Sequence, residues 1–434
     1  MSPGVLGAWA KGDRMEMRGV IIVLASLIGL GGVYATPARA ETTVADRAIL
    51  AAERSLQRNR YDGTAYYRLG DAYIQKARET GDAAYFGRAE GALQRSLALA
   101  PHHSGATRHL AYVRYSVHDF AMATTLAAKA IELDPTDGHA YGILGDALLE
   151  VGKYEPAEAA YRRMLERESD LHAWGRLAGL KSVRGDPASA IEMLARAIEE
   201  GQANRRPRES IAWAQWQLGA EHFTIGDLKA AEARYRESLG TYPNYHRALA
   251  GLAQVKAAQR RYAEAVDLYQ RAIAVIPLPD YAAALGDLHR MMGRPDAAAR
   301  QYDLVEYIGR LNALNQVIYS REQAYFDADH DRQLDRALEL ARKELEVRRD
   351  VYAYDVLAWA LYKKGELAEA RTAIDDAMKL GTRDARLFFH AGMIYRGLGE
   401  MDAAKVYLRR ALATNPHFHV LHADLAQRLL SDEP

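Results

Sequence analysis

One alanine recurs along the chain at a nearly constant interval, and this period constrains the fold more than any other feature. The interval is 33 or 34 residues in seven of nine cases, with two longer intervals of 41 and 39 residues. Such a unit has room for two helices but cannot bury its apolar face alone, so each unit must pack against its neighbours. The ten units, numbered 1 to 10 below, are anchored by Ala89, Ala123, Ala157, Ala190, Ala231, Ala265, Ala298, Ala337, Ala370 and Ala404.

Each unit also repeats small and large residues at fixed distances from its alanine. Twelve positions earlier stands a glycine or an alanine in eight of units 2 to 10, and Gly70 fills that role in unit 1. Two antiparallel helices approach closely only where side chains are small, so these positions mark the crossing point of two helices. In five units a proline twelve positions after the alanine ends the second helix. Large residues four positions after the alanine are expected to fill the gaps between neighbouring units, as Tyr161, Tyr235, Tyr269, Tyr302 and Leu408 would.

This pattern resembles the tetratricopeptide repeat family over about residues 46 to 430. The resemblance implies an all-α fold: a right-handed α-solenoid of about ten helical hairpins with terminal capping helices. From about residue 324 the chain also looks like a group of bacterial exported tetratricopeptide proteins. We expect a capping helix in 41–60, units 1 to 7 in 61–305, an irregular connector with units 8 to 10 in 306–416, and a second capping helix and tail in 417–434.

Three stretches depart from the repeat, and each is expected to change the path of the solenoid. In unit 1, seven extra residues around "RETGDAAYF" are expected to lengthen each helix by one turn. Between units 4 and 5, "GQANRRPRES" is expected to form a longer polar loop. Between units 7 and 8, "YIGRLNALNQVIYSREQAYF" replaces the short turn with helical sequence, and we expect a break in curvature there.

The composition excludes several classes of function. Lys plus Arg equals Asp plus Glu, at 57 each, so no chain-wide positive field attracts nucleic acid or an anionic membrane. The chain has no cysteine, which removes disulfides, thiolate zinc sites and cysteine nucleophiles. It also lacks a glycine-rich phosphate loop, a G-x-S-x-G elbow and an H-E-x-x-H pair. We therefore predict that the protein is not an enzyme, uses no cofactor and does not bind nucleic acid.

The first forty residues have the order of a secretory signal. Arg18 precedes an apolar run of 15 residues, from Val20 to about Tyr34, and the small-x-small triplet "ARA" follows. The run is shorter than the roughly 20 residues that a membrane-spanning helix needs, and the triplet suits cleavage after Ala40. We expect a signal peptide over 1–40 and export to the periplasm or beyond. The alternative is an uncleaved segment that anchors the body to the inner membrane and makes the only membrane contact.

The stretch "DADHDR" (327–332) resembles a cation-binding loop. It places carboxylates at alternate positions, Asp327, Asp329 and Asp331, but Arg332 stands where a calcium loop requires glycine. The stretch ends where other units carry the glycine of their inter-helix turn. We therefore predict a turn between two helices, in which Asp331 or Asp335 caps the helix that follows.

The segment "NPHFHVLHAD" brings three histidines to the start of the C-terminal capping helix. Only His419 and His422 share a face of that helix, and His417 points elsewhere. A transition-metal site needs a third convergent ligand and supporting hydrogen bonds, and the sequence shows neither. We interpret the histidines as surface residues and predict no metal site. The carboxylates of "DADHDR" remain the weak candidate for one.

The concave face of a stack of helical hairpins is lined by the first helix of each unit. Side chains rich in Trp, Tyr and Arg fall on this stripe, and these residue types dominate binding energies at protein interfaces. We predict a scaffold that binds another envelope protein or a peptide segment. The alternatives are stacking on sugar rings in polysaccharide export or cell-wall assembly, and ordinary packing between helices. The predicted groove residues are Tyr67, Asp71, Arg108, Tyr112, Tyr115, Trp213, Trp216, Phe223, Tyr352, Asp355, Trp359 and Tyr362.

Overall fold

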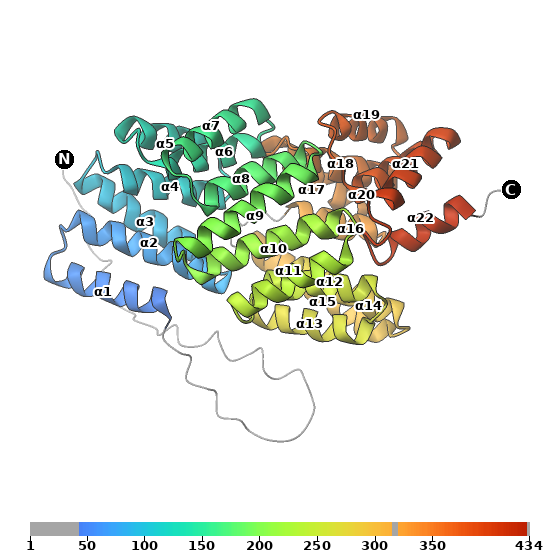
Figure 1. The fold of residues 1–434 in the computed structure, drawn as a ribbon, viewed down its shortest axis with the longest axis horizontal. Helices are drawn as coiled ribbons and strands as arrows, with labels where there is room; N and C mark the ends of the chain where they lie inside the picture. Colours follow the sequence, from blue (N-terminus) through green and yellow to red (C-terminus); the bar gives the residue numbers. More distant parts are fainter. Residues whose placement is uncertain (1–42, 315–319, 432–434) are drawn as a thin grey trace, which may run out of the picture. The chain divides into compact units, whose positions relative to one another are not determined.

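The computed structural model describes residues 43–314 and 320–431, and within these ranges the chain forms helices and no strand (Figure 1). The chain separates into two parts, Met1–Thr43 and Val44–Pro434, and every helix described lies in the second part. The helices are α1 (Val44–Arg58), α2 (Gly63–Thr80), α3 (Ala84–Leu99), α4 (Ser104–Ser116), α5 (Phe120–Leu133), α6 (Gly138–Glu150), α7 (Tyr154–Arg167), α8 (Leu171–Val183), α9 (Pro187–Ala203), α10 (Arg208–Thr224), α11 (Leu228–Thr241), α12 (His246–Ala258), α13 (Tyr262–Val275), α14 (Pro279–Met291), α15 (Pro295–Leu314), α16 (Ser320–Asp329), α17 (Leu334–Val347), α18 (Val351–Lys364), α19 (Leu367–Met378), α20 (Ala385–Gly397), α21 (Met401–Thr414) and α22 (His422–Ser431).

Helices α2 to α21 pair into consecutive hairpins, one for each of the ten units, with α1 before them and α22 after them. The predicted all-α solenoid is therefore confirmed. The second capping helix begins later than expected, at His422, so that residues 417–421 form a turn that leads into it.

Each hairpin is held together at the predicted crossing point, where all ten anchoring alanines are buried. In unit 3 a Cβ added to Gly145 would lie 2.4 Å from the Tyr161 ring, so only glycine makes room for that ring. The Tyr235 ring packs in the same way against Gly219 of its own unit and also against Gly251 of the next unit. The large residues thus fill the interior of their own hairpin, and not only the gaps between units.

The extra residues of two irregular units are absorbed by longer helices. In unit 1, α2 has 18 residues and α3 has 16, so the insertion lengthens the first helix more than the second. The longer polar loop predicted between units 4 and 5 is wrong, because α9 and α10 have 17 residues each and leave only 204–207 between them. Pro207 is the one helix-breaking residue that remains there, and it stands directly before α10.

The junction between units 7 and 8 is helical up to Leu314 and again from Ser320, as the sequence predicted, while residues 315–319 lie outside the described ranges. The "DADHDR" stretch is a turn between α16 and α17, also as predicted. The predicted cap is wrong, however. Gln333 is the N-cap of α17 and its side chain forms no capping hydrogen bond, whereas Asp331 has a φ of 52° and Asp335 lies inside the helix.

The solenoid coils back on itself within Val44–Pro434. Turns in units 3, 4 and 5 contact the segments that follow units 8, 9 and 10, and Figure 1 shows α17 to α20 beside α6 to α9. A Cβ at Gly152 or Gly185, both at positive φ, would lie 2.4 or 2.3 Å from a carbonyl oxygen of the facing segment. Hydrogen bonds run from the Arg349 N–H to the Glu150 carbonyl (2.9 Å), from the Thr382 hydroxyl to the Val183 carbonyl and from the Asn415 amide to the Phe223 carbonyl (2.7 Å).

A buried ionic network joins the two turns of the solenoid. Arg321 of α16 forms ion pairs with Asp350 (2.9 Å) and Glu344 (3.0 Å), and Arg348 pairs with Glu344 (2.9 Å) and Glu150 (2.8 Å). Burial raises the pKa of Glu150, and the positive charge of Arg348 opposes that rise. Because the five charges alternate in sign across the contact, each carboxylate has a cationic partner inside the protein.

Candidate functional site

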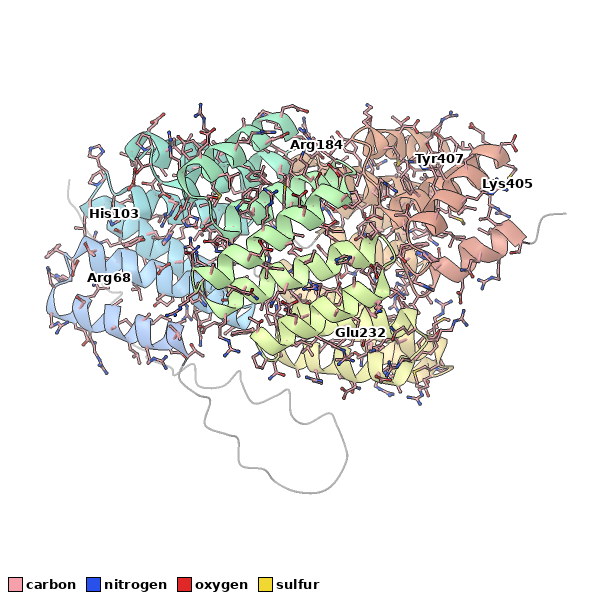
Figure 2. The ribbon with its side chains drawn as sticks, in the orientation of Figure 1. Arg68, His103, Arg184, Glu232, Lys405 and Tyr407 are labelled. Carbon is pink, nitrogen blue, oxygen red and sulfur yellow. The ribbon has the colours of Figure 1, made fainter. Side chains whose placement is uncertain are left out.

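The inner helices of units 1 and 2 gather predicted groove residues around two histidines. The Tyr67 ring packs against His103, labelled in Figure 2, and against His109, with ring centroids 4.7 and 5.1 Å apart. Beside them Arg108 forms an ion pair with Asp137, the N-cap of α6 (2.9 Å). Burial, and then the positive charge of Arg108, lowers the pKa of His109 to about 4, so this ring is neutral at pH 7. This end of the inner face presents aromatic surface and a cation that already has a partner.

Three more predicted residues of units 1 and 2 lie nearby. Asp71 is exposed, whereas Tyr112 is half-buried against the apolar side chains of α2 and α4. The Tyr115 ring packs on Phe120, and its hydroxyl lies 3.4 Å from a carboxylate oxygen of Glu150, next to the ionic network. Tyr115 therefore belongs to the contact between the two turns of the solenoid as much as to the inner face.

A line of rings continues across units 3 to 5. His139 faces His172, and His172 faces Trp213, with ring centroids 6.1 and 6.3 Å apart. Burial, followed by the charge of Arg176, lowers the pKa of His172 to about 4. Trp216 lies one helical turn farther along α10, beneath the guanidinium of an arginine in α12, and both tryptophans are half-buried. We call Tyr67, His109, His139, His172, Trp213 and Trp216 the ring stripe.

In unit 9 two of the four predicted groove residues, Trp359 and Asp355, lie in the core, and the other two, Tyr352 and Tyr362, are half-buried. Trp359 is 2% exposed and is stacked between the rings of His390 (4.2 Å) and Tyr362 (5.0 Å). Its Nε1–H donates to Asp329 (2.7 Å). The expectation that this tryptophan lies on an open stripe is therefore corrected, because its ring is covered on both faces by other side chains of the chain.

Asp355 is buried as well, and Tyr352 is half-buried. The carboxylate of Asp355 accepts a hydrogen bond from the Tyr325 hydroxyl (2.7 Å) and lies 2.9 Å from Nδ1 of His390. Burial alone would raise the pKa of Asp355, but the neighbouring His390 and the hydrogen bonds hold it below its ordinary value. Asp355 is thus an internal acceptor that fixes two rings around it.

The three carboxylates of "DADHDR" do not converge. Asp327 is paired with the Arg336 guanidinium (2.6 Å), Asp329 accepts from Trp359, and Asp331 is paired with the Lys363 ammonium (2.6 Å). A calcium site needs these oxygens around one centre, so the three do not form the cation loop that their alternation suggests.

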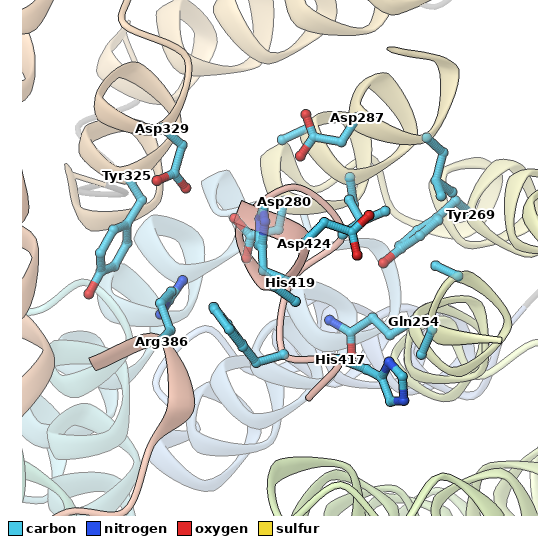
Figure 3. Close-up of a pocket in the computed structure, with 18 of the residues that line it drawn as sticks. Gln254, Tyr269, Asp280, Asp287, Tyr325, Asp329, Arg386, His417, His419 and Asp424 are labelled. Carbon is cyan, nitrogen blue, oxygen red and sulfur yellow. The ribbon is translucent and has the colours of Figure 1, made fainter. Parts of the chain in front are cut away.

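A cavity of about 360 Å³ lies inside the solenoid, between α12, α14, α16 and α20 on one side and the segment 416–427 on the other. Phe223, a predicted groove residue, lines it too. The Arg386 guanidinium lies 4.2 Å above the Tyr325 ring and forms no ion pair with a described residue. Figure 3 shows Arg386 and Tyr325 together at one side of the cavity, with His419 and Asp424 of the C-terminal segment across from them.

Acidic groups face the same cavity. Asp280 comes from α14 and Glu322 from α16. Burial, and then the negative charge of Glu322, raises the pKa of Asp280 to about 7, although solvent in the cavity still reaches its carboxylate. Near neutral pH Asp280 is therefore partly protonated and can donate a hydrogen bond as well as accept one.

Sequence profiles described as tetratricopeptide repeat match the chain, one at residues 385–418 and another at 109–173, 143–205 and 217–282. The chain belongs to the tetratricopeptide repeat family. The resemblance drawn from the alanine period is thereby confirmed.

A stretch of 125 residues of this tetratricopeptide chain is 32% identical to "Cellulose synthase operon protein C" of Pseudomonas fluorescens (strain SBW25). The match covers 28% of the chain but only 10% of that protein. Among solved structures, PilW, a type IV pilus biogenesis factor, is 19% identical with a TM-score of 0.40, over 48% of this chain and 92% of PilW. Human IFIT1 bound to m7Gppp-AAAA is 15% identical with a TM-score of 0.49, over 78% of this chain and 76% of IFIT1.

Tetratricopeptide repeats are generally non-catalytic scaffolds that bind proteins. Within the described ranges, no helix is both long enough and apolar enough to cross a membrane.

The cavity residues were missed in the sequence because their neighbours come from distant units. The repeat pattern places Arg386, Asp280 and Glu322 on the inner stripe, at the positions that the tryptophans occupy in unit 5, but it does not show that they meet. His419 and Asp329 did carry a signal, since each belongs to a motif that stood out by itself. The link between those two motifs depends on how the solenoid coils, which the period does not specify.

Proposed function

We propose that this chain is a non-catalytic scaffold of the bacterial cell envelope that binds another protein, or a peptide segment of one, along the inner face of units 1 to 5. One observation carries this proposal. The tryptophans of the ring stripe are only half-buried, whereas Trp359 of unit 9 is taken into the core. Half-buried aromatic rings retain surface for a partner and are typical anchors of protein interfaces. Membership of a repeat family whose members bind proteins supports the same function.

The chemistry of the stripe indicates what kind of segment would bind there. His109 and His172 are neutral at pH 7, and Arg108 already has an internal ionic partner. A cluster of charges on the partner would gain little from such a surface. We therefore expect an extended segment that inserts aromatic or aliphatic side chains between the rings and forms hydrogen bonds with the imidazoles.

The experiment uses a peptide that is selected from a display library against the wild-type chain. Trp216→Ala is expected to weaken its binding by about 2 kcal/mol or more, a rise in Kd of about 30-fold, because interface tryptophans contribute strongly to affinity. The urea midpoint should change little, since the ring is half-buried. Fluorescence anisotropy measures the affinity, and pull-down from an envelope extract then identifies the natural partner.

Trp174→Ala provides a matched control. Trp174 of α8 is also half-buried and lies beneath an arginine, Arg196, as Trp216 lies beneath Arg247. Both rings pack against a hydrophobic core, but Trp174 does not belong to the ring stripe. This control should bind the peptide with wild-type affinity. Equal affinities for both variants, together with a lower melting temperature of Trp216→Ala, would assign Trp216 to packing and overturn the proposal.

A second candidate function is an accessory role in polysaccharide export or cell-wall assembly. The partial similarity to cellulose synthase operon protein C favours it, and rings such as Trp213 and Trp216 are also suited to stacking on sugars. A soluble cello-oligosaccharide serves as the probe in the same titration. Saturable binding that Trp216→Ala abolishes would support this function over a protein partner.

Export is the remaining element of the proposal. It rests on the order of charged, apolar and small residues in 1–40, which lie outside the described ranges. We expect the mature protein to begin at Glu41 and to be recovered from the periplasm. Amino-terminal sequencing of the protein from fractionated cells checks this expectation. An intact start at Met15 or Met17, recovered from washed membranes, would support the anchored alternative instead.

A further inference from the structure

Three potential metal ligands from two distant segments meet at the wall of the cavity. Asp329 is the last residue of α16, His419 lies in the turn before α22, and His422 is the first residue of α22. One ligand atom of each residue lies within 4.8 Å of the other two. The carboxylate of Asp329 is 3.8 Å from Nε2 of His422, and the rings of the two histidines are stacked with centroids 4.3 Å apart. Asp329 of "DADHDR" thus provides the third ligand that the two histidines of "NPHFHVLHAD" lack.

His422 lacks the partners that a structural histidine has. It is only 7% exposed, its Nδ1 is buried without a hydrogen bond, and its Nε2 is too far from Asp329 for one. Buried polar atoms are nearly always paired, so an unpaired imidazole calls for a ligand.

Neighbouring side chains orient the candidate ligands by hydrogen bonding and packing, as the side chains around a metal site do. The Trp359 Nε1–H donates to Asp329 at 2.7 Å and fixes the orientation of the carboxylate. The Phe389 ring is stacked on His422 with centroids 4.7 Å apart, which limits the rotation of the imidazole. His330 is close to the cluster but does not belong to it, because its Nε2 lies 2.7 Å from a carboxylate oxygen of Asp287.

We propose that Asp329, His419 and His422 bind a divalent transition-metal ion, with Zn²⁺ as the best match. Two imidazoles and one carboxylate form a common ligand set for zinc, whereas calcium and magnesium prefer oxygen ligands alone. Bonds of about 2.0 to 2.2 Å in a tetrahedron place ligand atoms about 3.3 Å apart, close to the observed 3.8 Å between Asp329 and His422. Because Asp329 and His419 also line the cavity, the fourth position opens toward it.

Metal binding also requires a local change at His419. The Leu421 N–H donates to Nδ1 of His419 (3.2 Å), so Nε2 carries the proton of the neutral ring. A bond from Nδ1 to the metal displaces the Leu421 N–H, and a bond from Nε2 moves the proton to Nδ1 and breaks the same hydrogen bond. Either way the turn before α22 rearranges slightly, and the ion ties α16 to the C-terminal helix.

The test is titration of the purified, chelator-treated full chain with Zn²⁺ by calorimetry, and with Co²⁺ by visible absorption. We expect one ion per chain and the absorption bands of tetrahedral Co²⁺. Asp329→Asn retains an acceptor for Trp359 and His419→Ala removes a half-buried ring of the turn, and each should weaken Zn²⁺ binding by at least 100-fold. Zn²⁺ should raise the melting temperature of the wild type but not that of either variant.

His417→Ala is the matched control, since His417 lies on the same segment and lines the same cavity but does not belong to the ligand group. It should bind Zn²⁺ with wild-type affinity. Melting of each variant without metal verifies that it is folded. Absence of stoichiometric binding to the wild type, or equal affinity in the wild type, Asp329→Asn and His419→Ala, would overturn the proposal. A loss in His417→Ala as large as in the other two variants would overturn it as well.

Discussion

Trp359→Ala is expected to lower the free energy of unfolding by about 3 to 5 kcal/mol, because it empties the space of a large ring in a filled core. The side chain is 2% exposed and lies between two stacked rings, those of His390 and Tyr362. Its loss also removes the N–H that donates to Asp329. Urea denaturation followed by circular dichroism measures the change.

Trp359→Phe separates the two contributions of this side chain. It retains part of the ring packing but loses the hydrogen bond to Asp329 and the volume of one fused ring, so we expect a destabilisation of about 1 to 3 kcal/mol, smaller than that of Trp359→Ala. Trp216→Ala, in which a half-buried ring is removed, should shift the urea midpoint least of the three. Equal small shifts in Trp359→Ala and Trp216→Ala would contradict the burial of Trp359 in unit 9.

The hairpins could be predicted from the sequence because each depends on contacts within one unit. The residues that hold a hairpin together lie close in the sequence: Gly145 and Tyr161, on either side of the buried anchoring alanine, are 16 residues apart. A repeat in residue type therefore reveals them. The polar loop predicted between units 4 and 5 failed for a local reason. Polar residues are as common on the exposed face of a helix as in a loop, and in this segment only Pro207 prevents a helix.

The candidate site was less predictable because it depends on how units stack over the length of a superhelical turn. Small rotations between units add up, and the sum brings the turn at Gly152 against Arg349. Trp359 is covered by rings of its own unit and of unit 10, whereas Trp216 stays half-buried, although both occupy the inner stripe of their helices. The packing of α22 near α16 brings His422 to Asp329, which no pattern in either segment could show.

Arg321→Ala is expected to destabilise the chain by about 3 to 5 kcal/mol, because it leaves buried carboxylates without a cation. The Arg321 side chain is 15% exposed and donates to both oxygens of Asp350 at 2.9 Å and to Glu344 at 3.1 Å. Asp350 is also the N-cap of α18 and accepts from the Ala353 N–H (2.7 Å). Repulsion between the two carboxylates should therefore also weaken the start of α18. Urea denaturation of the wild type and the variant measures the loss.

Two further variants distinguish a buried network from ordinary surface charge. Arg321→Lys retains the positive charge, but one ammonium cannot replace both the Nη2 that contacts Asp350 and the Nε that contacts Glu344, so its midpoint should lie between those of the wild type and Arg321→Ala. Arg163→Ala, which removes an exposed pair with Glu166, should leave the midpoint unchanged, since solvent screens such pairs. If 1 M NaCl abolished the difference between Arg321→Ala and the wild type, screened charges would account for it. Persistence of the difference in salt would show that Arg321 stabilises the chain through the ion pairs with Asp350 and Glu344, which salt does not screen.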